Sequence, residues 1–464
     1  MKVIQVHNYY QLSGGEDGVV AAEASLLRSH GNDVVIYNKD NRSIGHGFAL
    51  IKSGLKSIWN WQTYREFREL LQREDPDIVH CHNTFPLISP SIYWACNREG
   101  VPVVQTLHNY RLLCINAFLF REGRASKGCK RCGDSVSRDG GGAGSWICEL
   151  CSGRIWKWPG VRYACYRGSR VGSAVVAVMI FFHWLIGTWS KKVTYYIALT
   201  EFQRGKMIDG GLPSEKILVK SNFLRADLAN KNLESDGVVE DDQRQSFLVG
   251  GNPYVVFVGR LSPEKGCDVL IRAWMQYLQR VRSTAGAEDQ LEMNCKFSDD
   301  LESGPKLVII GDGPERTSLE NLVKTLTRND DVFFGGSVVF LGKKSKSEVR
   351  DFMLNAEALI LPSVWYEGFP MTVLESFACG TPVVASDVGG MREIIREMQN
   401  GLKFRIGDFG QLSKKIEWIF SHKEAIVEMG GKAQRDFEEM YSDGVNYEAL
   451  KYIYDRALVS FGEV

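Results

Sequence analysis

Apolar and polar positions alternate along this chain in a repeating order of short apolar run, polar loop and amphipathic helix. Such runs occur in the first half at residues 1–7, 33–37, 78–81, 103–107 and 196–202, and in the second half at 254–258, 306–310, 338–342, 358–361 and 383–385. Strands that alternate with helices favour a doubly wound α/β fold with parallel sheets. The 464 residues are too many for one core, so we expect two domains.

Breaks in the pattern predict the domain boundaries. We expect an N-terminal domain at residues 1–222, with a cysteine-rich insertion at about 114–165, and a C-terminal domain at residues 252–446. Residues 223–251 are polar, acidic and aperiodic, which is typical of a linker. Residues 282–303 lack steady periodicity and indicate an insertion, whereas residues 447–464 have a helical pattern.

The most informative stretch is residues 363–375, which follows the apolar run at 358–361. Pro370 suits a first helical position and Gly380 suits a helix stop, so a strand, a loop and a helix are predicted here. Glu367 then lies at the carboxyl end of a strand, and Glu375 about two turns into the helix. Ligands of open α/β sheets bind at that edge, and carboxylates accept hydrogen bonds from neighbouring hydroxyl groups.

Other loops at strand ends carry groups that suit phosphates. Arg260 and Lys265 follow the run at 254–258, and a guanidinium fork and an ammonium charge suit a diphosphate, although solvated surface cations are the common alternative. Gly14 and Gly15 precede a predicted helix, where glycine and free amides admit an anion, but a plain tight turn explains them equally well. The third glycine of the dinucleotide fingerprint is missing, which disfavours an NAD oxidoreductase.

Composition excludes some classes of function. Lys plus Arg equals Asp plus Glu, with 56 of each, which argues against bulk nucleic-acid binding. The chain begins directly in a predicted core strand with no secretory leader, and its eleven cysteines are an odd number, so we expect thiols in a reducing cytosol. The apolar residues 171–189 contain polar positions, which favours a buried or interfacial helix over a membrane span.

Six of the cysteines gather in one region as two Cys-x-x-Cys pairs and two single residues. Paired thiols at this spacing are typical of structural zinc sites, and unmetallated thiols are the alternative. The six are Cys114, Cys129, Cys132, Cys148, Cys151 and Cys165.

The stretch from Glu367 to Glu375 resembles the acid–seven residues–acid signature of family-four retaining glycosyltransferases, and residues 380–390 match the same family. The resemblance covers most of the chain apart from the insertions and residues 223–251. It implies the GT-B fold, in which two Rossmann-like domains face each other across a cleft. It also implies an enzyme that moves a sugar from a nucleotide-diphosphate sugar to an acceptor, with retention of configuration.

The resemblance assigns roles to individual residues. It implies that Glu367 binds the sugar and supports the electron-poor anomeric carbon, and that Glu375 holds the ribose. Arg260 and Lys265 would hold the donor phosphates. His108, in residues 106–111, resembles a histidine that contacts the transferred sugar from the other domain.

Further contacts are implied at the loops and the early strand ends. The amides of Gly368 and Phe369, and the loops of Gly14, Gly15 and Gly311, are candidates for donor contacts. His82 and Asn83 are weaker candidates on the acceptor side. Residues 158–170 match a family branch whose common thiols would be Cys114, Cys148, Cys151 and Cys165, with Cys129 and Cys132 as an alternative pair, so the zinc ligand set stays open.

The acceptor is expected to be a saccharide or a lipid-linked saccharide of cell-surface polysaccharide synthesis. Asp75-Pro76-Asp77 precedes a strand and no Asp-x-Asp stands in a suitable loop, so catalysis is expected to need no metal or other cofactor. The aromatic and basic residues 52–70 either dock on a membrane surface or fill the core, so a cytoplasmic location, peripheral on the inner face of the plasma membrane, is considered. A nucleotide-sugar epimerase or hydrolase, and a zinc-dependent interaction module with an inactive cleft, are the rival functions.

Overall fold

The structure is a computed structural model that describes residues 1–9, 15–41, 54–121, 147–225, 251–288, 304–327 and 336–462. The described residues form two compact units. Unit 1 contains those up to Arg225 together with those from Tyr441 onward, and unit 2 contains those from Gly251 to Met440. The C-terminal helix therefore belongs to the same unit as the N-terminal strands.

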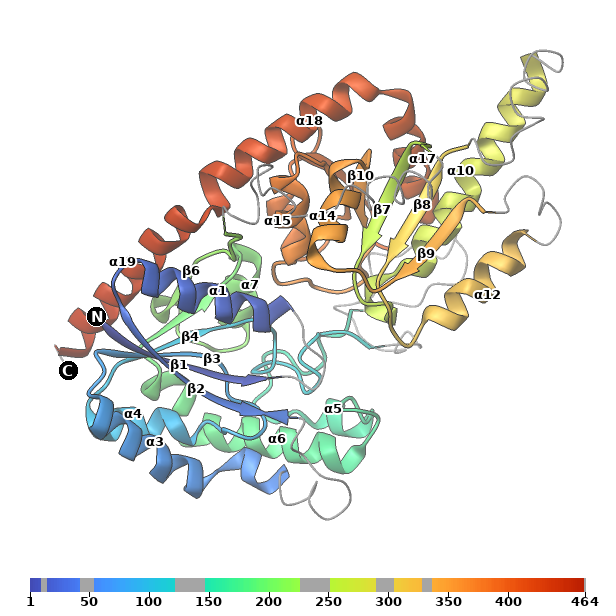
Figure 1. The fold of residues 1–464 in the computed structure, drawn as a ribbon. Helices are drawn as coiled ribbons and strands as arrows, with labels where there is room; N and C mark the ends of the chain where they lie inside the picture. The colour runs from blue at the N-terminus through green and yellow to red at the C-terminus, as the bar shows by residue number, and fades with distance from the viewer. Residues whose placement is uncertain are drawn as a thin grey trace. The chain divides into compact units, whose positions relative to one another are not determined.

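Unit 1 is built on a parallel sheet of six strands in the order β2-β1-β3-β4-β5-β6 (Figure 1). The strands are β1 (Lys2–Tyr9), β2 (Asp33–Asp40), β3 (Ile78–Asn83), β4 (Val103–Thr106), β5 (Tyr195–Ala198) and β6 (Ile217–Val219). The strands β3, β4 and β5 are buried along their whole length, as expected for a parallel sheet that is covered on both faces.

Helices cover both faces of this sheet. Figure 1 shows α1 and α19 on one side of the strands and α3, α4 and α6 on the other. The helices are α1 (Gly15–Ser29), α3 (Trp61–Glu74), α4 (Ser91–Glu99), α5 (Trp158–Arg162), α6 (Arg170–Leu185), α7 (Glu201–Asp209) and α19 (Asp443–Gly462). The helix α19 contributes Leu450, Ile453, Tyr454 and Ala457 to a core that also contains Val3, Ile78 and Ile197.

Unit 2 repeats the plan with a second parallel sheet in the order β12-β11-β10-β7-β8-β9. Its strands are β7 (Tyr254–Val258), β8 (Lys306–Ile310), β9 (Val338–Gly342), β10 (Ala358–Leu361), β11 (Val383–Ser386) and β12 (Gly401–Phe404). Its helices are α10 (Cys267–Glu288), α12 (Arg316–Thr327), α14 (Lys346–Leu354), α15 (Met371–Ala378), α16 (Met391–Ile394), α17 (Phe409–Ser421) and α18 (Lys423–Asp436). The α/β fold predicted from the alternating pattern is confirmed.

Some elements differ from the sequence prediction. The strand β6 follows β5 at the sheet edge, whereas residues 196–202 were expected to hold the last strand of the first domain. The strand β12 was not predicted, and α16 is only four residues long. Very short elements give too few positions for a hydrophobic period to be recognised.

The aromatic segment and the apolar helix of unit 1 are mostly structural. Phe67 is fully buried and Leu70 is nearly so, whereas Trp61, at the start of α3, is 63% exposed. The helix α6 buries residues such as Ile180 and His183. Across the described part of the chain, every helix is too short or too polar to span a bilayer.

Candidate active site

Glu367 is the centre of a polar cluster in unit 2. Its atom Oε1 accepts hydrogen bonds from Lys265 Nζ at 2.6 Å, Ser363 Oγ at 2.8 Å and Trp365 Nε1 at 3.0 Å. We call these four residues the acid–lysine cluster. Glu367 is only 6% exposed, and a buried carboxyl group needs hydrogen-bond partners to replace the water it has lost. Its position and orientation are therefore fixed by the protein.

The acid–lysine cluster is assembled by loops at the carboxyl ends of neighbouring strands. Lys265 lies in the loop after β7, and the other three members lie in the loop after β10, which pairs with β7. The amide of Val364 donates to the carbonyl of Glu264 at 2.9 Å and ties the two loops together. The prediction that Glu367 lies in this loop is confirmed by the bounds of β10 and α15.

The loops approach so closely that two positions require glycine. Gly266 has φ +66°, and a Cβ there would lie 2.2 Å from the carbonyl oxygen of Pro362. Gly311, after β8, has φ +139°, and its Cβ would lie 1.8 Å from the carbonyl oxygen of Gly259. Only glycine tolerates both the conformation and the contact. Gly311 thus shapes the edge of the sheet, and its donor contact remains a prediction.

Glu375 lies in the second turn of α15, as predicted. Burial raises the pKa of its carboxyl, and the charge of Lys346 offsets only part of this effect. A half-buried carboxylate that is poorly solvated is suited to accept hydrogen bonds from a ligand, because such bonds replace the water it has lost.

The remaining donor-side candidates differ in their accessibility. Arg260 is exposed, and within the described residues its guanidinium makes no hydrogen bond or ion pair. Gly368 and Phe369 are buried in the turn that leads into α15. These positions are compatible with a phosphate contact for Arg260 and a backbone contact for the turn.

His108 is the first polar residue in the loop after β4 of unit 1, and it is partly exposed. Its Nε2 lies 3.0 Å from Nδ1 of His82 on β3, and the two rings are stacked. Burial, reinforced by the neighbouring histidine, lowers the pKa of His108 well below its usual value. His108 is therefore neutral at ordinary pH, and it can exchange hydrogen bonds without carrying a charge.

The other residues of unit 1 that the sequence suggested as ligand contacts differ in their positions and exposure. Gly15 is the first residue of α1, whereas Gly14 lies outside the described residues. His82 is buried beneath His108. Asn83 donates to the carbonyl of Asn8 at 2.9 Å and accepts from the amide of Phe85 at 3.0 Å, so its side chain braces two loops.

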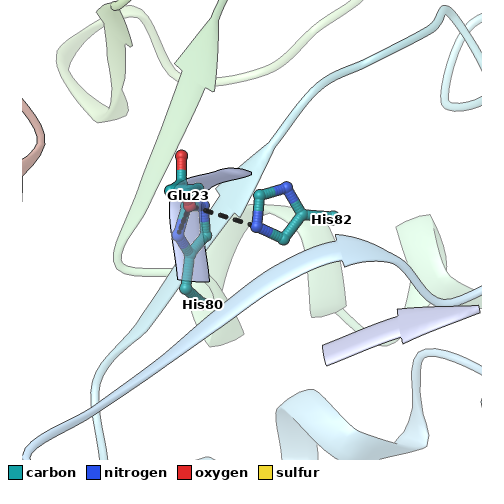
Figure 2. A group of neighbouring side chains, drawn as sticks. All are labelled: Glu23, His80 and His82. Atoms are coloured by element: carbon teal, nitrogen blue, oxygen red, sulfur yellow. Dashed lines mark ion pairs between the residues drawn. The ribbon is translucent and has the colours of Figure 1, made fainter. Parts of the chain in front are cut away.

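The acid beneath these histidines, Glu23, was not predicted from the sequence. Glu23 on α1 is 1% exposed, and its Oε1 lies 2.9 Å from His80 Nδ1 and 3.2 Å from His82 Nε2 (Figure 2). Its Oε2 lies 3.4 Å from Nζ of Lys220. Burial alone would raise the pKa of Glu23, but His80, Lys220 and His82 hold it well below the usual value. We call Glu23, His80, His82, His108 and Lys220 the histidine network.

Four of the predicted thiols gather in unit 1, and Cys129 and Cys132 lie outside the described residues. Cys148 is brought near Cys114 because its amide donates to the carbonyl of Leu119 at 2.8 Å. Burial, and then the charge of neighbouring thiols, raises the pKa of Cys151 and of Cys165 to about 12. Burial also raises the pKa of Cys114, and the amides of Asn116 and Leu119, which point at its sulfur, offset part of this rise.

This donor set fits a thiolate-binding ion in kind, because neighbouring thiolates and amide donors are what such an ion requires. Within the described residues, however, the only group of three or more His, Cys, Asp or Glu donors within 4.8 Å of one another is Glu23, His80 and His82. The four sulfur atoms are thus neighbours, but no three of them lie within 4.8 Å of one another.

Comparison with known proteins places these features in a family context. A family model described as "Glycosyl transferases group 1" matches residues 238–436, and one described as "Glycosyltransferase Family 4" matches residues 14–132. The two matches contain Arg260, Lys265, Glu367 and Glu375 on one side and His82 and His108 on the other.

Curated relatives match over part of the chain. An uncharacterized glycosyltransferase of Methanocaldococcus jannaschii, MJ1607, is 31% identical over 228 residues, which are 48% of this chain and 48% of that protein. A D-inositol 3-phosphate glycosyltransferase of Gordonia bronchialis is 27% identical over 207 residues, which are 45% of this chain and 41% of that protein. The chain thus spans about half the length of these relatives.

Solved structures match over nearly the whole chain. Anabaena Alr3699/HepE, crystallised in complex with UDP, has a TM-score of 0.62 and 16% identity and covers 98% of this chain and 100% of its own. Sucrose-phosphate synthase of Thermosynechococcus elongatus has a TM-score of 0.62 and 14% identity, with 99% of both chains covered. At these identities the likeness shows the fold.

Proposed function

Because the chain belongs to the family-four glycosyltransferases of the GT-B type, we propose that it moves a sugar from a nucleotide-diphosphate sugar to a saccharide or lipid-linked saccharide, with retention of configuration. The observation that carries the proposal is the acid–lysine cluster, in which Glu367 is fixed by three hydrogen bonds at the carboxyl edge of the sheet of unit 2. Anabaena Alr3699/HepE, which was also crystallised in complex with UDP-glucose, supports a donor of this class.

In this proposal, unit 2 binds the donor. Glu367 supports the positive charge that develops at the anomeric carbon, because transition states of glycosyl transfer resemble an oxocarbenium ion. Lys265, held beside Glu367, and Arg260, in the same loop, stabilise the negative charge of the departing diphosphate. Glu375 accepts hydrogen bonds from the ribose. Since these two cations supply the charge, the proposed reaction needs no catalytic metal.

Unit 1 contributes His108 and the acceptor-side loops. The neutral imidazole contacts a hydroxyl group of the transferred sugar, and the polar residues at the ends of β1, β3 and β4 surround the acceptor. The exposed Trp61 at the start of α3 supports a peripheral contact with a membrane that carries the acceptor lipid. Binding to anionic lipid vesicles should weaken in a Trp61→Ser variant.

The first experiment is a thermal-shift screen of nucleotide sugars, because a donor that binds the native state raises the melting temperature. The donor found in this way is then incubated with lipid-linked and soluble saccharides, and the anomeric configuration of the product is determined by NMR. Product formation with retained configuration supports the proposal. Epimerised donor or free sugar without acceptor would instead favour an epimerase or a hydrolase.

We also propose that the cysteine-rich segment holds a structural zinc ion, with ligands from Cys114, Cys148, Cys151 and Cys165 and with Cys129 and Cys132 as the alternative pair. In that case the purified protein should contain about one zinc per chain by elemental analysis, and Cys148→Ser should lose it together with thermal stability. Moderate chelation should leave turnover unchanged. Protein that contains no zinc, and whose four thiols react freely in the native state, would contradict this proposal.

A further inference from the structure

In the histidine network, the buried carboxylate of Glu23 determines which groups donate hydrogen bonds and which accept them. Glu23 is ionised, so both of its oxygens can only accept hydrogen bonds. His80 Nδ1 and His82 Nε2 lie 2.9 Å and 3.2 Å from Oε1 (Figure 2). Gln5 Nε2 donates to the same atom at 3.1 Å, and Lys220 approaches Oε2. Gln5 and Lys220 thus donate to the carboxylate, and one ring nitrogen of each histidine lies close to Oε1.

This arrangement assigns the proton of His82. Burial lowers the pKa of His82 to about 4, so its ring is neutral and carries one proton. That proton lies on Nε2, because Nε2 is next to a carboxylate oxygen, which cannot donate. The other nitrogen, Nδ1, then has a free lone pair and is an acceptor.

The same logic assigns the proton of His108. Its Nε2 lies 3.0 Å from the acceptor Nδ1 of His82, so Nε2 of His108 must be the donor. His108 is also neutral, and its single proton is thus placed on Nε2. The remaining nitrogen, Nδ1, keeps its lone pair, and it makes no hydrogen bond to any described residue. His108 is partly exposed, so this acceptor is available to a ligand.

The network is braced from the far end of the chain. Lys220 Nζ also donates to Oδ1 of Asn446 at 3.1 Å, and Tyr454 of α19 lies 2.7 Å from His80 Nδ1 through its hydroxyl. Thr106 Oγ1 occupies the second ring nitrogen of His80 at 2.8 Å. These contacts hold the ring of His80 in place, because it is buried and both of its nitrogens have a specific partner.

A metal ion is the other use that such a group of donors suggests, but the surroundings oppose it. Gln5 already donates to Glu23 Oε1 and Lys220 donates to Oε2, and both nitrogens of His80 have hydrogen-bond partners in Tyr454 and Thr106. The ammonium of Lys220 already balances the carboxylate, and a divalent cation would be repelled by it. The pattern is that of a hydrogen-bonded support.

We propose that Glu23 and His82 are positioning residues, which hold His108 in the tautomer whose Nδ1 accepts a hydrogen bond from a substrate hydroxyl group. The proposal rests on the proposed function, in which His108 contacts the transferred sugar. It adds the direction of that hydrogen bond: the sugar must donate and His108 must accept. A donor analogue whose hydroxyl at the contacted position is replaced by fluorine, which cannot donate, should therefore react poorly.

The tautomer can be measured directly by NMR of protein labelled with ¹⁵N in its histidines. Protonated and unprotonated ring nitrogens of a neutral imidazole have well-separated chemical shifts, and the eight histidines of the chain are few enough to assign with single His→Gln variants. In the wild type we expect Nδ1 of both His82 and His108 to be unprotonated. A proton on Nδ1 of His108 would overturn the proposal.

The support is then removed in a charge-balanced way. Glu23→Leu combined with Lys220→Met deletes the buried ion pair without leaving one charge alone, so the variant should fold. His108 should then populate both tautomers, and kcat should fall about 10-fold to 100-fold, as expected when a buried orienting partner is lost. Glu66→Gln, which disrupts the partly exposed pair of Glu66 with Lys39 at 3.2 Å, is the matched control and should change neither value.

A second variant guards against misfolding of the first. His82→Leu removes the nitrogen that accepts the hydrogen bond from His108. In this variant, too, His108 should populate both tautomers. An unchanged tautomer of His108 in both folded variants would overturn the proposal. So would stoichiometric binding of added Zn²⁺ or Mn²⁺ that disappears in the Glu23→Leu/Lys220→Met variant, because the ion would then take the lone pairs assigned here.

Turnover of a His108→Gln variant distinguishes a failure of this proposal from a failure of the proposed function. If His108→Gln keeps full turnover, His108 does not contact the sugar, and the proposal falls with that assignment. If His108→Gln is impaired but the wild-type tautomer is not fixed, only the positioning by Glu23 and His82 is wrong. If both results are as expected, the fluorinated donor should lose no further rate in the Glu23→Leu/Lys220→Met variant.

Discussion

At the scale of single residues, the hydrogen bonds to Glu367 lead to a sharp expectation for catalysis. Glu367→Gln keeps the shape of the side chain but removes the charge that opposes the developing cation. We expect kcat to fall about 100-fold to 1,000-fold, the range found when one electrostatic contact to a transition state is lost, with little change in donor affinity. Turnover and calorimetric donor binding measure the two effects.

The control for this substitution is Glu424→Gln, which changes an exposed acid at the start of α18 in the same unit. Turnover in this variant should equal that of the wild type. Full turnover in Glu367→Gln, with folding unchanged, would show that the acid–lysine cluster is structural.

Glu375 gives a second expectation, which concerns pH. Burial raises its pKa, so the carboxyl takes up a proton at a higher pH than an ordinary glutamate. As the pH falls toward that raised pKa, the carboxylate that would accept from the ribose is lost, and donor affinity should decrease. Hydrogen bonds to a charged group contribute about 1.5–3 kcal/mol, so Glu375→Gln should weaken binding about 10-fold to 100-fold.

The stability of the Glu375→Gln variant distinguishes a binding role from a structural one. An acid with a raised pKa is less favourable in its charged form in the folded state than in the unfolded state. At pH 7 the substitution should therefore leave the melting temperature unchanged or raise it, and the low-pH loss of donor affinity should disappear. A lowered melting temperature with wild-type binding would contradict this role.

The residues that sequence could predict are those close together along the chain. Glu367 and Glu375 were found because one strand, one loop and one helix place both. Glu23 was not found, because on α1 it looks like an ordinary acid of a solvated face. It is buried among His80, Lys220 and Tyr454, from β3, the segment after β6 and α19, and no local pattern reports contacts between segments so distant in sequence.

At the scale of elements, the loop after β7 depends on Gly266. Alanine there would adopt an unfavourable positive φ and place Cβ 2.2 Å from a backbone oxygen. We expect Gly266→Ala to lower the free energy of unfolding of unit 2 by at least about 1–3 kcal/mol and to misplace Lys265. Gly431→Ala, in the interior of α18 with only the far end of Arg435 nearby, should instead be neutral or stabilising by up to about 1 kcal/mol.

Chemical denaturation of the two variants measures this difference. Equal stability of both would mean that the loop relaxes around the new methyl group. Sequence predicts individual elements better than the contacts between them. The strand β10 was predicted from its apolar run, whereas the close approach of Gly266 to Pro362 depends on β7 and β10 being neighbours in the sheet. The order of strands is set by packing of the whole unit, and no local pattern reports it.

At the scale of the whole molecule, two sheets with separate cores predict that the units unfold in separate steps. Ile453 of α19 is 2% exposed and packs in the core of unit 1, so Ile453→Ala should cost about 2–5 kcal/mol in that unit alone. A saturating nucleotide-sugar donor should mainly stabilise unit 2, by about 2.7 kcal/mol at a concentration of 100 Kd.

Differential scanning calorimetry with and without donor tests both effects in one design. Ile453→Ala should lower one transition, and the donor should raise the other in the wild type and in the variant alike. Val459→Ala, at a position of α19 that is 64% exposed, should move neither transition by more than a fraction of the Ile453→Ala effect, because it opens no cavity. If the donor raised the transition that Ile453→Ala lowers, and left the other unchanged, the donor would bind chiefly to unit 1, and the assignment of the nucleotide to the loops around Glu367 and Glu375 would be wrong.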